Sequence, residues 1–452
     1  MRVPAVSAVA TEPDTNRALG WVLVVWSIVT SGVALFGLPV PLGGVIAIAL
    51  LVTAGAAVVR FDFAHPYVWC GAAFFLYHAS VPILFLAGLW PRSDALREVG
   101  FVSWSGLAAF MLAVGPARVS WRALPGPDDF RVFVTWSLAT VSFVVTGLYV
   151  WAILRGGYTS KEEIALGSSL LLRLDPAYSV LTLCLAIIVG GQLQSGRIPL
   201  GLMALSFLWF GLAFAIGGER DLVLRLAWVF VFIWHVTYRR LSKGAWLVVG
   251  LVAALMINVL ADLKNVLVRD VGDDPTVSDV TRLASLYPDE FVTASDNLQR
   301  LISEGPWPKF YGKTLLWDAR QAIGVGFLGS TPGPAPTALF NAHFFPEIVS
   351  AGGGRGFSLV GEGYMNFGTA GAVIWLALLG LLAGVLYRKA SGGLMWVAVY
   401  ALSMPLFVYV MRADFSNLMS QGMKHILLPA GLILASAEVV RRATNQESIA
   451  GP

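Results

Sequence analysis

Charged residues are scarce in this sequence. Only 13% of its 452 residues are charged and 57% are hydrophobic, whereas an ordinary soluble domain carries roughly 25% charged residues. A soluble fold of this length cannot hide so much apolar surface. We therefore expect an integral membrane protein, and the 16 tryptophans, many near the ends of apolar runs, suit the aromatic belt of a bilayer interface.

Several chemical signatures are also missing. Cys70 and Cys184 both lie in apolar runs, so neither a disulfide framework nor a metal cluster is expected. Neither a Walker A motif nor a GxGxxG pattern with a following acid occurs, and no serine nucleophile elbow is present. The net charge of +4 is modest and lies in short loops. We therefore expect no cofactor, no metal and no nucleic-acid partner.

Long apolar runs fill most of the chain. A run of roughly 15 to 25 apolar residues can cross a hydrocarbon core about 30 Å thick. The sequence thus predicts an all-α polytopic membrane protein with about twelve transmembrane helices. The runs lie near 19–37, 40–59, 66–90, 99–115, 130–154, 177–191, 198–217, 222–238, 244–261, 370–387, 393–411 and 423–440.

The runs divide the chain into three parts. Residues 1–261 hold transmembrane helices 1–9, residues 262–369 form a long loop with short helices, and residues 370–452 hold helices 10–12 and the C-terminus. Short loops on the N-terminal side of the membrane carry more Lys and Arg than those opposite, which predicts that both termini are cytoplasmic and the long loop is extracytoplasmic. A reporter fused after Pro275 that proved cytoplasmic would contradict this topology.

The first polar cluster is GGERDLVLR, residues 217–225, at the outer start of the eighth run. A helix N-terminus binds anions readily, and Arg220 and Arg225 would add positive charge for a phosphate or pyrophosphate. Asp221 and Arg225 are four residues apart and share a helix face. The alternative is that Asp221 caps the helix and neutralises Arg225.

The second cluster ends the long loop, in the stretch GFSLVGEGYMNFG. Arg355, Ser358, Glu362 and Asn366 are spaced three, four and four residues apart, which predicts that they share one helical face. A partly desolvated Glu362 would suit a general base acting on a sugar hydroxyl, and the flanking glycines would let a ligand or a neighbouring backbone approach. The alternative is that Glu362 pairs with Arg355, or with another arginine, and locks the loop onto the bundle.

The third cluster lies between the last two runs. Arg412, Asp414, Lys424 and His425 gather in one short connection. Interfacial anchoring explains Lys424, and a structural ion pair is the alternative for Arg412 beside Asp414. His343 has Glu347 four residues later, but no third ligand accompanies them, so a metal site is not expected.

Two motifs and the topology together resemble a known family. With GGERDL before the eighth run and GEGYMNFG before the tenth, the chain resembles the bacterial oligosaccharide repeat-unit polymerases, the Wzy-type O-antigen and capsule polymerases, which are related to O-antigen ligases. The resemblance implies a GT-C-like membrane glycosyltransferase of the bacterial plasma membrane with an extracytoplasmic active site. A growing glycan on undecaprenyl pyrophosphate would be transferred onto the terminal sugar of another lipid-linked unit. The implied partners are those lipid-linked oligosaccharides, membrane lipids, and in some settings a flippase and a chain-length regulator.

The residue clusters suit this chemistry, because guanidinium groups stabilise a leaving diphosphate and a carboxylate assists the attacking hydroxyl. An O-antigen-ligase-like transferase and a lipid-linked oligosaccharide transporter stay open as alternatives. The expected roles are pyrophosphate binding by Arg220, Arg225, Arg355 and Arg412; catalysis by Glu362 as leading base, then Asp221 and Asp414, with Arg220 and Arg355; and sugar binding by Tyr364, Asn366, His343 and His425.

Overall fold

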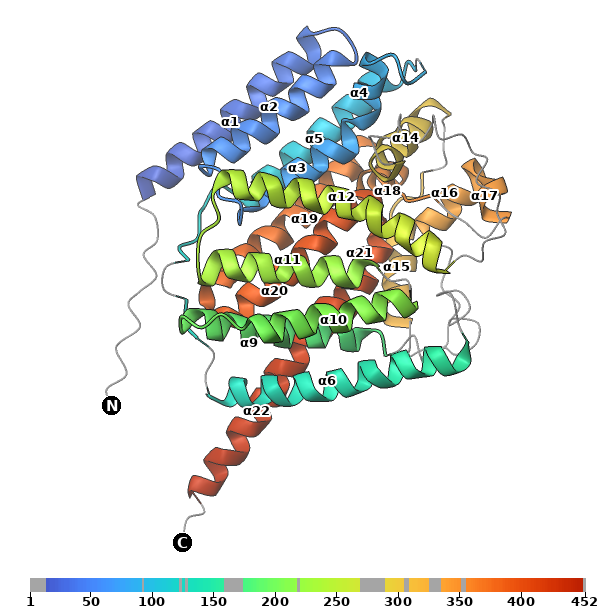
Figure 1. The fold of residues 1–452 in the computed structure, drawn as a ribbon. Coiled ribbons are helices and arrows are strands. Elements are labelled where there is room, and N and C mark those ends of the chain that lie inside the picture. The colour runs from blue at the N-terminus through green and yellow to red at the C-terminus, as the bar shows by residue number, and fades with distance from the viewer. Residues whose placement is uncertain are drawn as a thin grey trace. The chain divides into compact units, whose positions relative to one another are not determined.

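Every element that the structure describes is helical (Figure 1). The structure is a computed structural model, and it describes residues 14–91, 93–121, 124–126, 129–157, 174–217, 220–268, 289–304, 309–324, 335–350 and 355–449. Within these ranges the chain therefore matches the all-α class predicted from its apolar runs.

Seven helical stretches of the described chain are long and apolar enough to cross a membrane, and an eighth is present if a pair of helices bent by 52° counts as one span. The bent pair is α3 (Pro66–His78) with α4 (Ser80–Leu86). The seven stretches fall on α1 (Asp14–Gly37), α5 (Leu96–Val114), α6 (Asp129–Gly156), α9 (Pro176–Gln194), α19 (Thr369–Lys389), α20 (Leu394–Tyr409) and the last stretch, which joins α21 (Phe415–Gly422), a π-helical turn (Met423–Leu427) and α22 (Leu428–Ile449). The length and apolar composition of these helices are thus those of a polytopic membrane protein.

The remaining predicted runs also fall on helices. They are α2 (Leu42–Val58), α10 (Leu200–Gly217), α11 (Arg220–Thr237) and α12 (Lys243–Val268), of which α2, α10 and part of α12 are apolar but short. The count of twelve spans and the extracytoplasmic loop therefore stay predictions.

The chain divides into two compact units. The first unit comprises Met1–Leu124, Asp289–Ser391 and Phe407–Ser416, and the second comprises Pro125–Pro288, Gly392–Leu406 and Asn417–Pro452. The first unit therefore brings the helices before residue 124 together with those of the predicted long loop. These are α14 (Asp289–Ser303), α15 (Lys313–Gly324), α16 (Pro336–Phe344), α17 (Pro346–Ser350) and α18 (Leu359–Phe367).

Glycines let the backbones of the first unit meet. A Cβ on Gly371, in α19, would lie 1.9 Å from the carbonyl oxygen of Gly363 in α18, and a Cβ on Gly363 would lie 2.6 Å from the backbone of Gly371 and Ala372. No side chain fits at such distances. Gly363, beside Glu362, thus serves the approach of a neighbouring backbone, one of the two uses expected from the sequence, whereas a Cβ on Gly361 would meet the side chains of Phe357 and Ser358 at 3.1 Å.

Candidate functional site

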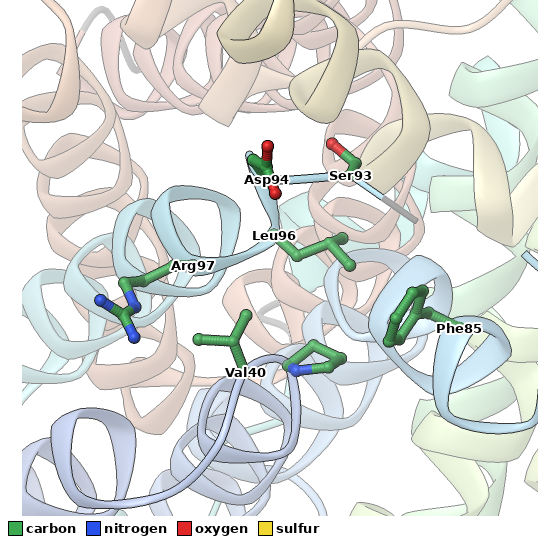
Figure 2. Close-up of a pocket in the computed structure, with 7 residues that line it drawn as sticks. Val40, Phe85, Ser93, Asp94, Leu96 and Arg97 are labelled. Atoms are coloured by element: carbon green, nitrogen blue, oxygen red, sulfur yellow. The ribbon is translucent and has the colours of Figure 1, made fainter. Parts of the chain in front are cut away.

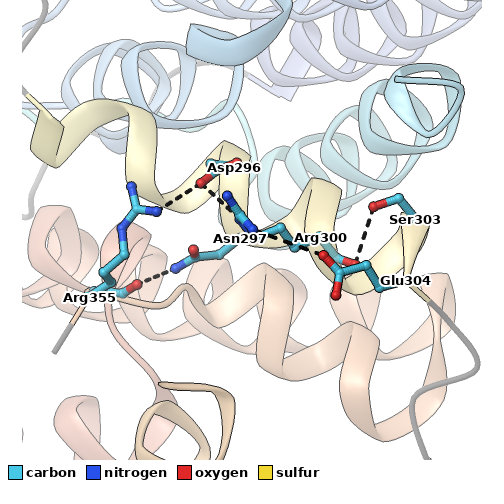
Figure 3. A network of polar contacts seen from close by, with 7 residues as sticks. Asp296, Asn297, Arg300, Ser303, Glu304 and Arg355 are labelled. Carbon is cyan, nitrogen blue, oxygen red and sulfur yellow. Dashed lines mark hydrogen bonds and ion pairs between the residues drawn. The ribbon is translucent and has the colours of Figure 1, made fainter. Parts of the chain in front are cut away.

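Two arginines and one aspartate form a compact cluster in the first unit (Figure 3). Asp296 and Arg300 lie four residues apart on α14, and Arg355 reaches the same carboxylate from the segment that precedes α18. Asp296 Oδ2 accepts from Arg355 at 3.1 Å and from Arg300 Nε at 3.2 Å. The aspartate side chain is buried, at 3% exposure, while the arginine side chains stay 26% and 36% exposed.

The ring of Phe345 lies against both guanidinium groups. Their central carbons are 4.8 Å (Arg355) and 5.0 Å (Arg300) from its centroid, within the range of a cation–π contact. Asn341 holds the Arg355 backbone through two hydrogen bonds of 2.9 Å. The Arg355 N–H donates to Asn341 Oδ1, and the Asn341 side-chain amide donates to the Arg355 carbonyl oxygen. Arg300 Nη1 also lies 4.0 Å from Glu304 Oε1, so the cluster holds two guanidinium groups in fixed geometry against two acids, and the exposed parts of both guanidinium groups can still meet an anion.

Glu362, the expected base, is completely buried in the first turn of α18. Ser358 caps this helix by accepting from the N–H of Gly361, so the helix begins after Arg355 and only part of the expected shared face forms. Glu362 Oε1 accepts from the Thr314 hydroxyl at 2.9 Å, and Oε2 accepts from the Phe415 N–H at 2.6 Å. Both carboxylate oxygens are therefore engaged with the protein, and Arg355 pairs with Asp296 instead.

Asp318, on α15, adds a second buried carboxyl group beside Glu362. Burial raises the pKa of Asp318, the carboxylates of Glu362 and Asp414 raise it further, and the Ser416 hydroxyl lowers it. Burial likewise raises the pKa of Glu362, to about 7, against the lowering effect of the Phe415 N–H. Protonated Asp318 can then donate to the Glu362 carboxylate, which avoids placing two buried negative charges together.

Asp414 is the third buried carboxylate of this group. Its Oδ2 accepts from both the N–H and the hydroxyl of Thr337, in the first turn of α16. Asp414 thus satisfies a free N–H at the start of α16, as a capping residue would. Glu362 likewise accepts from the N–H of Phe415, the first residue of α21. These two acids therefore each stabilise the start of a helix.

Raising the pH is expected to destabilise the protein. The pKa of Glu362 is about 7 in the folded chain against 4.5 ordinarily, so the folded chain keeps a proton that the unfolded chain has lost. The stability that this proton contributes is complete below pH 4.5 and is lost as the pH rises through 7, and the raised pKa of Asp318 makes stability fall with rising pH in the same direction. Thermal unfolding in detergent should therefore have a lower midpoint at pH 8 than at pH 5.

Glu362→Gln is the control for this pH effect, because the amide keeps the shape of the side chain and does not titrate. Its profile should be flatter than that of the wild type. Equal pH dependence in both proteins would contradict the assignment of the proton to Glu362.

Tyr364 and Asn366 complete α18. The Tyr364 hydroxyl donates to Glu98 Oε1 at 2.8 Å, and burial together with that carboxylate raises the pKa of the phenol, so it stays a donor. Asn366 is buried and donates to Thr314 Oγ1 at 2.7 Å. Of these two expected sugar-binding residues, Tyr364 is partly exposed, whereas Asn366 supports the environment of Glu362.

Arg412 and His343 also lie in the first unit. The Arg412 guanidinium lies over the Tyr409 ring at 5.4 Å, and the Arg412 backbone packs against Gly356, where a Cβ would be 2.9 Å from its carbonyl oxygen. Arg412 is therefore next to the segment that carries Arg355. His343 is exposed on α16 and contacts the edge of Phe344. No group of three or more His, Cys, Asp or Glu within the described ranges is arranged to hold a metal ion.

A separate polar chain lies in the second unit. Arg225 pairs with Asp221 at 2.9 Å and donates to Ser179 Oγ at 3.3 Å, and Ser179 is hydrogen-bonded to His425 Nδ1 at 2.6 Å. His425 Nε2 is 3.9 Å from Asp175. The structure thus joins three expected residues, Asp221, Arg225 and His425, to two unexpected ones. Arg220 begins α11, and its side chain lies outside what the structure describes.

Several of these side chains were not expected from the sequence. Asp296, Arg300 and Asp318 read as the polar faces of amphipathic loop helices, and nothing local distinguishes them from solvated residues. Only the fold places Asp296 beside Arg355. Ser179 and Asp175, at the start of the sixth run, carried one weak signal, the Asp-Pro pair at a helix start.

Helical throughout its described ranges and carrying seven or eight candidate membrane spans, the chain belongs with the polytopic membrane proteins. Residues 297–438 match the family model of the O-antigen polysaccharide polymerase Wzy. The resemblance to the repeat-unit polymerases is therefore confirmed over this segment, which contains Arg300, Arg355 and Glu362. No curated protein and no solved structure matches the chain.

Proposed function

We propose that this chain polymerises lipid-linked oligosaccharide repeat units. The growing glycan would pass from undecaprenyl pyrophosphate to the terminal sugar of another lipid-linked unit, and undecaprenyl pyrophosphate would leave. The observation that carries this proposal is the arginine cluster of Arg300, Arg355 and Asp296, because two of its members lie within the matched segment 297–438 and its partly exposed guanidinium groups suit a diphosphate.

The reaction breaks the bond between the anomeric carbon and a phosphate oxygen. Negative charge grows on that oxygen, and donors already fixed in place stabilise it without reorganising. Arg355 is fixed by Asp296, Phe345 and the Asn341 amide, and Arg300 shares two of these supports. We assign Arg355 and Arg300 to the diphosphate. Arg412, in the same unit, keeps its expected role as a further cation. For Arg220 and Arg225, in the second unit, pyrophosphate binding stays a prediction from the sequence.

The attacking hydroxyl of the acceptor must lose a proton. A general base needs an oxygen within hydrogen-bond reach of that hydroxyl. Because Glu362 is buried and both its oxygens accept from the protein, the geometry favours a role in holding the matched segment together. We therefore assign Glu362 and Asp414 to positioning, and the base role expected for Glu362 is the alternative that a glutamine variant separates.

The setting of the reaction follows from the predicted topology. We place the chain in the bacterial plasma membrane, with twelve spans, cytoplasmic termini and residues 262–369 outside, where the arginine cluster would meet exported lipid-linked glycans. A flippase would supply such substrates, and a chain-length regulator would act on the product.

A reconstituted assay tests the activity. Purified chain in liposomes, given only lipid-linked repeat units, should produce a ladder of longer glycans and release undecaprenyl pyrophosphate. Absence of any extension would contradict polymerisation. Transfer onto an added lipid acceptor alone would support the ligase alternative, and movement of intact lipid-linked units across the bilayer without extension would support a transporter.

A further inference from the structure

A cavity of about 260 Å³ lies in the first unit, apart from the arginine cluster (Figure 2). It forms where three connections meet: the turn between α1 and α2, the end of α4 and the start of α5. Val40, Pro41, Phe85 and Leu96 give it apolar walls, and Ser93, Asp94 and Arg97 give it polar groups. Phe85 and Arg97 lie on opposite sides, with Ser93 and Asp94 along the edge that faces Val40 (Figure 2).

The polar groups of the cavity are available to a ligand. Within the described part of the chain, neither the Asp94 carboxylate nor the Arg97 guanidinium makes an ion pair or a hydrogen bond, and both side chains are exposed. Ser93 Oγ accepts from the Ala95 N–H at 3.2 Å, which leaves its hydroxyl hydrogen free to donate. The cavity thus offers an acceptor-only carboxylate, a donor-only guanidinium and a hydroxyl.

This combination fits a sugar ring. Pockets for drug-sized ligands usually enclose about 300 to 1,000 Å³, so a cavity of about 260 Å³ suits one ring rather than a longer oligosaccharide. Sugar hydroxyls both donate and accept, and the apolar walls can cover the C–H face of the ring. The charges of Asp94 and Arg97 balance, so the cavity suits a neutral ligand such as a sugar.

The cavity is linked to the matched segment through α5. The first turn of that helix carries Leu96 and Arg97 at the cavity, and the next residue, Glu98, accepts from Tyr364 at 2.8 Å. Tyr364 lies within the match to residues 297–438, two residues after Glu362. A ligand in the cavity would therefore contact α5, which is hydrogen-bonded to α18 through Glu98 and Tyr364.

We propose that this cavity binds one sugar ring of the lipid-linked repeat unit. The proposal rests on the proposed polymerase function and adds to it a sugar subsite formed by α1, α4 and α5 connections outside the matched segment. Asp94 and Arg97 would fix the hydroxyl groups, and Phe85 would cover the apolar face.

A binding measurement tests the site separately from catalysis. The full chain in nanodiscs is titrated calorimetrically with the repeat-unit oligosaccharide of its host, freed from the lipid. Asp94→Asn and Phe85→Ala should each weaken binding about tenfold, as expected for the loss of one charge-assisted hydrogen bond or one apolar wall. Leu86→Ala, an exposed neighbour that does not line the cavity, is the matched control and should bind like the wild type.

The outcomes separate the two proposals. If the wild type extends glycans while Asp94→Asn and Phe85→Ala bind the oligosaccharide as it does, the sugar subsite is wrong and the polymerase function stands. If the wild type binds the oligosaccharide, loses affinity in both variants and never extends a glycan, the subsite stands and the polymerase function is wrong. Unchanged thermal midpoints in the variants establish that they fold, and weaker binding by Leu86→Ala to the same degree would overturn the site.

Discussion

Arg355→Ala is expected to slow glycan extension by about 100- to 1,000-fold, the usual effect of removing one preorganised donor to a developing negative charge. The protein should still fold, because Arg300 continues to neutralise the buried Asp296 carboxylate. Since the contact strengthens as the diphosphate leaves, kcat should fall more than KM rises. The measurement is initial rate of extension in liposomes at several substrate concentrations.

Two further variants sharpen this test. Arg355→Lys keeps the charge but loses the planar fork, so we expect it to restore little of the activity. Arg442→Ala is the control, because Arg442 is an exposed arginine that pairs with Glu438 four residues before it and should be dispensable. Full activity in Arg355→Ala would remove this residue from the site.

Glu362→Ala is expected to lower the free energy of unfolding by about 3 kcal/mol, because it leaves buried groups without their partner. The Thr314 hydroxyl and the Phe415 N–H would lose their acceptor, and Asp318 would lose the carboxylate beside it. Thermal unfolding and the yield of folded protein in detergent report the change.

Glu362→Gln decides between the two roles of this side chain. Glutamine can still accept from the Phe415 N–H, but it cannot take a proton from a sugar hydroxyl. We expect it to fold and to retain most of the extension activity. A stable Glu362→Gln protein without activity would instead establish Glu362 as the base. Glu347→Gln, an exposed acid on α17, is the control and should change neither property.

The sequence predicted the helices well, because an apolar run of sufficient length has few alternatives in a membrane. It also singled out Arg355 and Glu362, since single charges at the edge of an apolar run are conspicuous, and the roles expected for them stay predictions. It did not reveal what these residues touch. Asp296, the partner of Arg355, is 59 residues away in sequence, and Asp318 lies on a helix whose polar face looks ordinary. The cavity likewise joins three connections that no local pattern relates.

The glycines of GEGYMNFG show the same limit. The sequence allowed either a ligand or another backbone to approach these glycines. Only the close contact between Gly363 and Gly371 shows that a backbone approaches Gly363. Close packing depends on where two helices cross, and that is fixed by the whole unit rather than by the residues beside each glycine.

The neighbouring buried acids Asp414 and Glu362 each accept a hydrogen bond from the first turn of a different helix. Asp414 accepts from Thr337 at the start of α16, and this helix is followed by Phe345, whose ring contacts the arginines. Glu362 accepts from Phe415, the first residue of the last apolar stretch. A proton gained or lost by Glu362 would change its contact with Phe415, and the carboxylate of Asp414 lies close enough to raise the pKa of Glu362. The start of the last apolar stretch and the start of α16 therefore both depend on neighbouring acids of one buried group.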